Sequence, residues 1–130
     1  MSGGAISWKS EKQSTIALSS TEAEYIAASE AAREIMGFRT FLNDIHYPQT
    51  LPTDLYVDNL TAINMTKEEG HNDRRKHINV KYHYIRERVQ EKDINIKWIE
   101  TKEQQADILT KPLPKDTFTY LRKLVMGVQE

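Results

Sequence analysis

The 130-residue chain contains no cysteine. That absence excludes disulfide bonds, thiolate metal sites and a cysteine nucleophile, and it favours a reducing compartment. No stretch is apolar for long enough to span a bilayer, and the first residues, MSGGAISWKS, lack the apolar core of a signal peptide. We therefore expect an intracellular protein, cytoplasmic or nuclear, that has no membrane partner.

An excess of charge of one sign is also missing. The chain has 18 Lys and Arg against 19 Asp and Glu, which gives a formal net charge of −1. Attraction of nucleic acid by the molecule as a whole is therefore not expected, and any such binding requires a local basic patch. Repeats and low-complexity tracts are absent too, and the length is that of one globular domain.

What the sequence does contain is a series of segments with strand-like and helix-like hydrophobic patterns, which follow one another along the chain. A period of two residues predicts strands at about 5–18 and 94–99, and the short apolar run LYV predicts a third strand at about 54–58. Helices, most of them marked by a period near 3.6 residues, are predicted at about 22–44, 60–68, 75–91, 104–109 and 115–126. Strands and helices in this order are typical of an α/β layered domain.

Three acidic residues stand where strands end or helices begin: Glu24 in LSSTEAEY, Asp58 in LYVDN and Asp107 in QADILTK. Each has an ordinary structural explanation. Glu22 and Glu24 both fit a capping box, Asp58 fits an Asx turn, and Asp107 fits the first turn of a helix. If the three converge, their oxygen ligands suit Mg²⁺ or Mn²⁺, and two such ions are the machinery of phosphodiester hydrolysis.

The segment HNDRRKHINVKYHYIRERV supplies a local basic patch. Between Asn72 and Lys92 there are seven Lys and Arg against three Asp and Glu. One interpretation is a helix face that is merely solvated. The other is phosphate binding to a nucleic acid backbone, for which the candidates are Arg74, Arg75, Lys76, His77, Lys81 and Arg86.

Four blocks of the chain together resemble the RNase H domain that ends the Pol polyprotein of copia-type LTR retrotransposons. They are ISWKSEKQSTIALSSTEAEYIAASEAAREI, YVDNLTAI, RRKHINVKYHYIRERV and QADILTKPLPKDTFTYLR. The resemblance implies an RNase H-like fold and cleavage of RNA in RNA–DNA hybrids by two-metal hydrolysis. It also implies that Glu24, Asp58 and Asp107 are the metal ligands, and that Glu22 is the capping residue.

The resemblance further implies a fourth acid, on the first strand of a five-stranded sheet with the order 3-2-1-4-5. The 130 residues start at the turn that follows the second of these strands, and no acid precedes Glu11. We therefore expect residues 1–130 to form one RNase H-like domain that is N-terminally incomplete and lacks its first two strands. Two Mg²⁺ or Mn²⁺ ions are expected only if the missing Asp is supplied.

Two classes of function follow. The first is a ribonuclease H of a copia-type retrotransposon, which is either impaired by the loss of the first catalytic Asp or completed by strands supplied from elsewhere. The alternative is a catalytically inactive, domesticated remnant that acts as a nucleic-acid-binding, regulatory or assembly module. Missing strands leave open sheet edges, which invite pairing. We therefore expect either that the first strand moves beside 55–57 or that two copies form a homodimer through strand edges.

Overall fold

The computed structural model describes residues 3–10, 12–13, 20–57 and 76–128. The chain divides into two compact units. One unit comprises Ala17–Trp98, and the other comprises Met1–Ile16 together with Ile99–Glu130.

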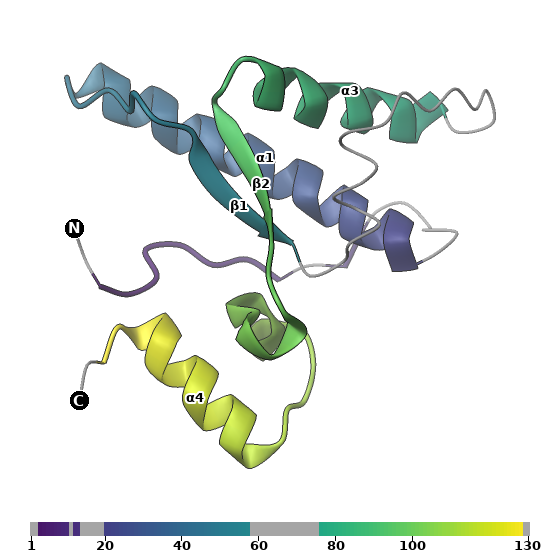
Figure 1. Cartoon of the computed structure of the whole chain (residues 1–130), viewed down its shortest axis with the longest axis vertical. Coiled ribbons are helices and arrows are strands. Elements are labelled where there is room, and N and C mark those ends of the chain that lie inside the picture. Colours follow the sequence, from purple (N-terminus) through teal and green to yellow (C-terminus); the bar gives the residue numbers. More distant parts are fainter. Residues whose placement is uncertain (1–2, 11, 14–19, 58–75, 129–130) are drawn as a thin grey trace. The chain divides into compact units, whose positions relative to one another are not determined.

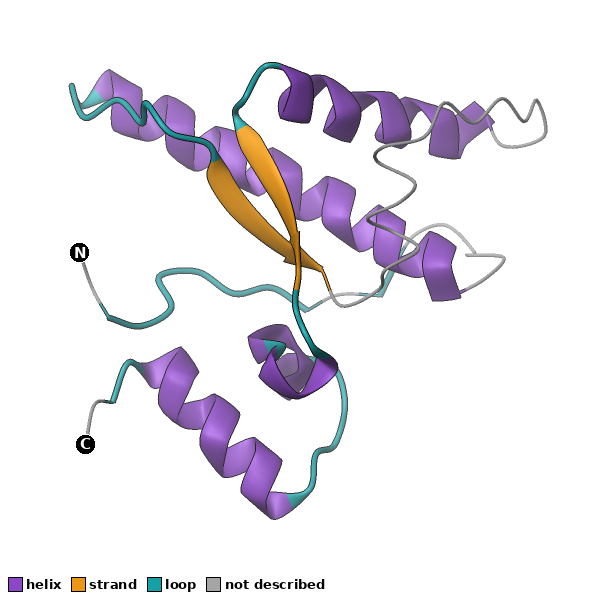
Figure 2. Cartoon of the chain, in the orientation of Figure 1, coloured by secondary structure: helices purple, strands orange, loops and turns teal. Residues whose placement is uncertain are grey.

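The unit Ala17–Trp98 is an α/β layer. Its described elements are α1 (Ser20–Asp44), β1 (Thr53–Val57), α3 (Lys76–Gln90) and β2 (Ile94–Trp98) (Figure 1). β1 and β2 form a parallel pair in which Thr53 faces Ile94 and Val57 faces Trp98. Both helices pack against this pair and against each other, and α1 passes behind the strands in Figure 2.

The core of this unit lies between the helices and one face of the strands. It consists of Tyr25, Ala28, Ala32, Val57, Ile85 and Ile94. Ala28 and Ala32 lie one turn apart on α1, and their small side chains let α3 and β1 approach the helix closely. The strands alternate as a half-buried sheet should, because Leu55 and Val57 face inward while Asp54 faces outward. There Asp54 accepts hydrogen bonds from Asn95 (2.9 Å) and Lys97 (2.8 Å).

The helices α1 and α3 both end in a Schellman motif. After α1, the N–H of His46 donates to the carbonyl of Asn43 (3.0 Å) and the N–H of Tyr47 to that of Leu42 (2.8 Å). The left-handed position of this motif usually holds glycine, but here it is occupied by His46, with φ 61°. Lys92, with φ 60°, has the same place after α3.

The other unit is built around α4 (Lys115–Met126) and two short 3-10 helices, η1 (Thr101–Glu103) and η2 (Gln105–Leu109). Leu121 is its buried apolar centre, and η2 packs against α4. The hydroxyl of Tyr120 on α4 donates to Glu103 Oε2 (2.6 Å).

Glycines at both ends of the chain make a close approach possible in this unit. α4 ends at Gly127, which has φ 65°, and a Cβ on Gly127 would lie 2.5 Å from the carbonyl of Gly3. Next to it, the N–H of Ala5 donates to the carbonyl of Val125 (2.8 Å). The N-terminal segment therefore packs on the last turn of α4.

Most expected elements are confirmed, and one is wrong. α1, α3, α4, β1 and β2 agree with the sequence to within a few residues, and the short helix expected at 104–109 is the 3-10 helix η2. The strand expected at 5–18 is absent over residues 5–10, 12 and 13, where Ile6 and Trp8 are 70% and 73% exposed. Alternation favours an extended chain, but a strand also needs a neighbour for its backbone hydrogen bonds. Within the described part of the chain, β1 and β2 pair only with each other.

The rearranged sheet, with the first strand beside 55–57, is consequently not seen in the described residues. The helix expected at 60–68 lies outside them. No helix in the described ranges is both long and apolar enough to cross a bilayer.

Candidate functional site

The first turn of α1 carries the two glutamates of the predicted site. The helix begins two residues before Glu22, so Glu22 lies where a capping glutamate should, although the expected capping partner is outside the described residues. Each helical residue is turned by about 100°, which puts Glu22 and Glu24 on different faces. Glu22 shares the inward face with Tyr25 and Ser29 and is 2% exposed, whereas Glu24 is half-buried. The assignment of Glu24 as the metal ligand stays a prediction.

The second predicted ligand, Asp58, directly follows the buried Val57 at the end of β1, and it lies outside the described residues. Because β1 and β2 are parallel and Val57 faces Trp98, both strands end at the same edge of the sheet. In α/β proteins the carboxyl ends of parallel strands are where ligands bind. The edge where the site was expected is therefore present, while the position of the Asp58 carboxylate stays a prediction.

Asp107, the third predicted ligand, lies in η2 and is 8% exposed. Its carboxylate is paired with an ammonium group, because Lys111 Nζ lies 2.7 Å from Asp107 Oδ2. Its backbone carbonyl also accepts hydrogen bonds from the N–H groups of Thr110 and Lys111, both at 3.2 Å. The sequence analysis missed Lys111. Its spacing of four residues from Asp107 in QADILTK, which suits an ion pair across one helical turn, was the available signal.

The three acids are divided between the two units. Glu24 and Asp58 belong to the unit Ala17–Trp98, and Asp107 belongs to the other. Within the described ranges, no three acidic or histidine side chains are grouped so that they hold a metal ion. The donor chemistry suits Mg²⁺ or Mn²⁺, since all three side chains offer carboxylate oxygens. The convergence of the three carboxylates stays a prediction.

The basic face of α3 is partly engaged in contacts within the protein. Lys81 Nζ lies 3.5 Å from Glu30 Oε1 on α1, and the Lys81 side chain is 22% exposed. Lys81 therefore links the two helices and is a weaker candidate for phosphate binding than the sequence suggested. Arg86 is half-buried. The other predicted contacts have no described side chains: Lys76 and His77 in the first turn of α3, and Arg74 and Arg75 outside the described residues.

A cluster on the same side of α3 escaped the sequence analysis. The guanidinium groups of Arg33 on α1 and Arg88 on α3 lie 5.7 and 5.9 Å from the ring centroid of Tyr84. Arg88 also pairs with Asp93 at 3.0 Å. Tyr84 therefore makes a cation–π contact with an arginine of each helix, and these contacts link α1 to α3.

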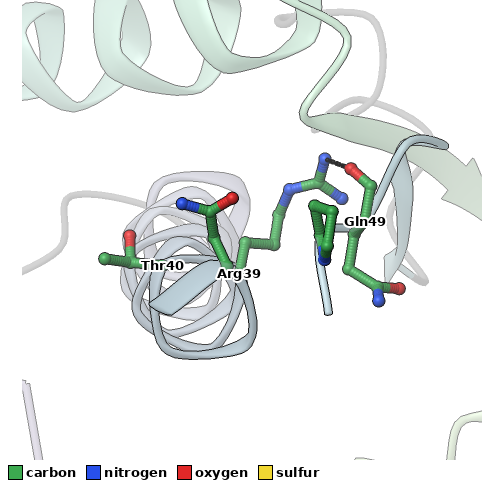
Figure 3. A pocket seen from close by; sticks show the side chains of 5 residues that line it. Arg39, Thr40 and Gln49 are labelled. Carbon is green, nitrogen blue, oxygen red and sulfur yellow. Dashed lines mark hydrogen bonds between the residues drawn. The ribbon is translucent and has the colours of Figure 1, made fainter. Parts of the chain in front are cut away.

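Arg39 is a second residue that the sequence analysis missed. It lies on the inward face of α1, one turn from Ile35, and its side chain is 12% exposed. The guanidinium donates to the carbonyls of Leu51 and Gln49 (both 2.9 Å) and to Thr53 Oγ1 (3.0 Å). Figure 3 shows Arg39 reaching across a cleft to the backbone of Gln49. An arginine at a core-facing helical position was the signal, because a buried guanidinium needs several acceptors.

Buried hydroxyl groups gather between α1 and α3. The rings of Tyr25 and Tyr82 stack with centroids 5.8 Å apart. Within the described residues, the hydroxyls of Tyr25, Ser29 and Tyr82 have no hydrogen-bond partner. Burial, and then the neighbouring Tyr82, raises the pKa of Tyr25 well above its ordinary value.

Nearly the whole chain is similar to a segment of transposon polyproteins. It is 43% identical over 124 residues to the retrovirus-related Pol polyprotein from transposon TNT 1-94 of Nicotiana tabacum. The matched segment covers 95% of this chain and 9% of that protein. Identity to the Pol polyprotein from transposon RE1 of Arabidopsis thaliana is 36% over 113 residues, 87% of this chain and 8% of that protein. The transposon Ty1-NL2 Gag-Pol polyprotein of Saccharomyces cerevisiae is 30% identical over 122 residues, 93% of this chain and 7% of that protein.

The chain is therefore homologous to one region of retrovirus-related transposon Pol polyproteins, and it spans less than a tenth of each of these three relatives. No family model matches the chain, and no solved structure matches it either.

Proposed function

We propose that this chain is the ribonuclease H region of a copia-type retrotransposon Pol polyprotein, which cleaves the RNA strand of RNA–DNA hybrids. One observation carries the proposal: the similarity to a tobacco Pol polyprotein extends over 124 of the 130 residues. The match leaves out only a few residues of the chain, so Glu24, Asp58 and Asp107 all lie within it. The three acids thus belong to the part of the chain that is shared with these polyproteins.

The proposed chemistry assigns the three carboxylates to a pair of divalent ions. Such ions, when bound, activate the attacking water and stabilise charge on the leaving oxygen. The Asp107 carboxylate supports this assignment, because it is buried and already holds one cation, the Lys111 ammonium, at 2.7 Å. Glu24 and Asp58 would complete the ligand set from the first turn of α1 and the end of β1.

The hybrid would be held through its phosphates by the basic segment around the start of α3. Contacts to phosphate position a nucleic acid without reading its sequence, so the proposed activity has no sequence preference. Arg74, Arg75, Lys76 and His77 are the residues we favour, together with Arg86. Lys81 has a smaller part because it is paired with Glu30.

Cleavage of a hybrid with a labelled RNA strand in Mg²⁺ tests the proposal. Two polypeptides are compared: the 130 residues alone, and the same residues joined behind the segment that precedes the matched region in the tobacco relative. The 130 residues hold three of the four acids that the resemblance implies. Loss of one electrostatic stabiliser commonly costs on the order of a hundred-fold in rate. We therefore expect the longer polypeptide to cleave about a hundred-fold faster or more.

Two variants of the longer polypeptide make the test specific. Asp58→Asn should abolish cleavage, whereas Asp54→Asn on the same strand should not, because Asp54 faces outward and pairs with Lys97. Hybrid binding without cleavage in either polypeptide would favour the non-catalytic module instead. Rapid cleavage by the 130 residues alone, lost in Asp58→Asn, would contradict the need for a fourth acid.

A further inference from the structure

The pairing of Asp107 with Lys111 differs from an ordinary surface ion pair. The Asp107 side chain is 12% exposed and the Lys111 side chain is 47% exposed, so a buried carboxylate meets a lysine that reaches it from solvent. The Lys111 ammonium lies 2.7 Å from Asp107 Oδ2, and the Lys111 N–H also donates to the Asp107 carbonyl. Lys111 therefore fixes both the backbone turn and the carboxylate of the same residue.

Physical chemistry explains why this carboxylate needs a cation. A buried carboxylate that lacks a counter-charge destabilises the fold, because it has lost its hydration. Lysine supplies a compact point charge on a flexible stem and, unlike arginine, does not clamp a carboxylate with two parallel hydrogen bonds. A half-exposed lysine can therefore swing into water when a stronger cation takes its place.

We propose that Lys111 is a positioning residue. Its ammonium holds the Asp107 carboxylate in the place of a divalent cation, and it is displaced when that cation binds. The inference rests on the proposed function, in which Asp107 is a metal ligand. Lys111 keeps the carboxylate in place and its charge balanced while the metal is away. It also competes with the ion, so that Mg²⁺ or Mn²⁺ binds Asp107 more weakly than it would without the lysine.

Thermal melting of the full chain with and without Mn²⁺ at constant ionic strength tests the inference. Lys111→Met removes the ammonium and should lower the melting temperature by about 5 °C in metal-free buffer. Millimolar Mn²⁺ should restore most of that loss, because the ion replaces the missing charge, while the wild-type chain should shift much less. A lysine with a purely structural role would not be replaced by a divalent ion.

Three further variants separate the charge from the fold. Asp107→Asn combined with Lys111→Met removes both charges, so this double variant should melt near the wild type and ignore Mn²⁺. Lys111→Arg should melt like the wild type and respond to Mn²⁺ least, since a guanidinium is harder to displace. Lys102→Met is the matched control. Its partner Glu100 lies 2.8 Å away, but both side chains are more than half exposed, so no Mn²⁺ response is expected.

Paramagnetic broadening of the Asp107 amide by Mn²⁺ completes the design. Broadening that sets in at several-fold lower Mn²⁺ in Lys111→Met than in the wild type supports the inference. Equal broadening in both, without thermal rescue, overturns the role of Lys111 and leaves Asp107 as a metal ligand. No broadening in either overturns the inference, whereas the proposed function is decided by the cleavage test of the longer polypeptide. Thermal rescue together with a longer polypeptide that does not cleave hybrids keeps this inference and rejects the nuclease.

Discussion

Two residues of the unit Ala17–Trp98 adopt a backbone conformation that glycine would adopt more easily. His46 and Lys92 have φ 61° and 60° at the ends of α1 and α3. The left-handed conformation costs a non-glycine residue roughly 1–2 kcal/mol, which a substitution by glycine would remove. Part of that gain in stability is offset, because glycine makes the unfolded chain more flexible. We expect His46→Gly and Lys92→Gly each to raise the free energy of unfolding by about 0.5–1 kcal/mol in urea titrations.

Gly127 provides the opposite case. It has the same conformation, and a side chain there would meet the backbone of Gly3. Gly127→Ala should therefore destabilise the chain. For His46 the comparison is Asn43→Gly, which should lower the free energy of unfolding because glycine inside a helix is unfavourable. Equal changes in the free energy of unfolding for His46→Gly and Asn43→Gly would contradict the role of the left-handed conformation.

Tyr25 is the residue for which a pH dependence follows. The unfolded chain releases this proton near the ordinary pKa of 10.0, whereas burial raises the pKa in the folded chain. Above pH 10 the unfolded state alone gains from deprotonation, so the contribution of Tyr25 to stability falls as the pH rises. Tyr25→Phe should remove this part of the alkaline loss. It should also stabilise the chain by about 1 kcal/mol at pH 7, because a buried hydroxyl without a partner in the described residues is removed.

Urea titrations at pH 7 and pH 10.5 measure both effects. The exposed Tyr47 is the matched control, and Tyr47→Phe should change neither value. Destabilisation by Tyr25→Phe at pH 7 would show that the hydroxyl makes a hydrogen bond in the folded chain.

At the scale of elements, Arg39 on α1 holds the segment that connects α1 to β1 by hydrogen bonds. Its guanidinium binds the carbonyls of Leu51 and Gln49 and the hydroxyl of Thr53, the first residue of β1. Arg39→Met would leave these carbonyls without their charged donor, and we expect a loss of about 3 kcal/mol in the free energy of unfolding. Arg33→Met removes a half-exposed ion pair with Glu30 and the cation–π contact with Tyr84, and it should cost under about 2 kcal/mol. Similar losses in the two variants would refute the role of Arg39.

The sequence was sufficient for elements whose spacing extends over several turns or residues. α1, α3 and α4 have long apolar faces, β2 has a short alternating run and β1 a short continuous apolar run, so local patterns locate all five. The strand expected around Ile6 and Trp8 failed because two alternating residues indicate an extended chain but not a partner for it. Pairing depends on residues far away in the sequence, and local spacing carries no information about them.

The candidate site was predictable in its residue types and less so in its surroundings. That Asp58 follows a buried strand can be read from the sequence, because LYV is a continuous apolar run. The burial of Asp107 depends on the packing of η2 against α4, and the inward direction of Glu22 depends on which face of α1 meets the core. Both depend on tertiary packing, and the convergence of the three acids stays a prediction for the same reason.

At the scale of the whole molecule, charge decides how nucleic acid can bind. The net charge of −1 gives no long-range attraction, so the binding that we propose would come from the basic segment and would depend steeply on salt. Each phosphate contact that is lost should lower the slope of log affinity against log salt by about one. Arg74→Gln combined with Arg75→Gln should therefore weaken the binding of an RNA–DNA hybrid and reduce this slope by about two.

Lys81→Gln is the matched comparison for that experiment, because the structure engages Lys81 elsewhere. Its ammonium lies 3.5 Å from Glu30, so its removal should change the slope by much less than one and lower stability slightly instead. Titrations of a fluorescent hybrid at several salt concentrations measure the slopes, and urea titrations of the same variants measure stability. A full unit of slope lost in Lys81→Gln, with no change in the arginine pair, would show that the protein binds the hybrid through the middle of α3 rather than through the segment before it.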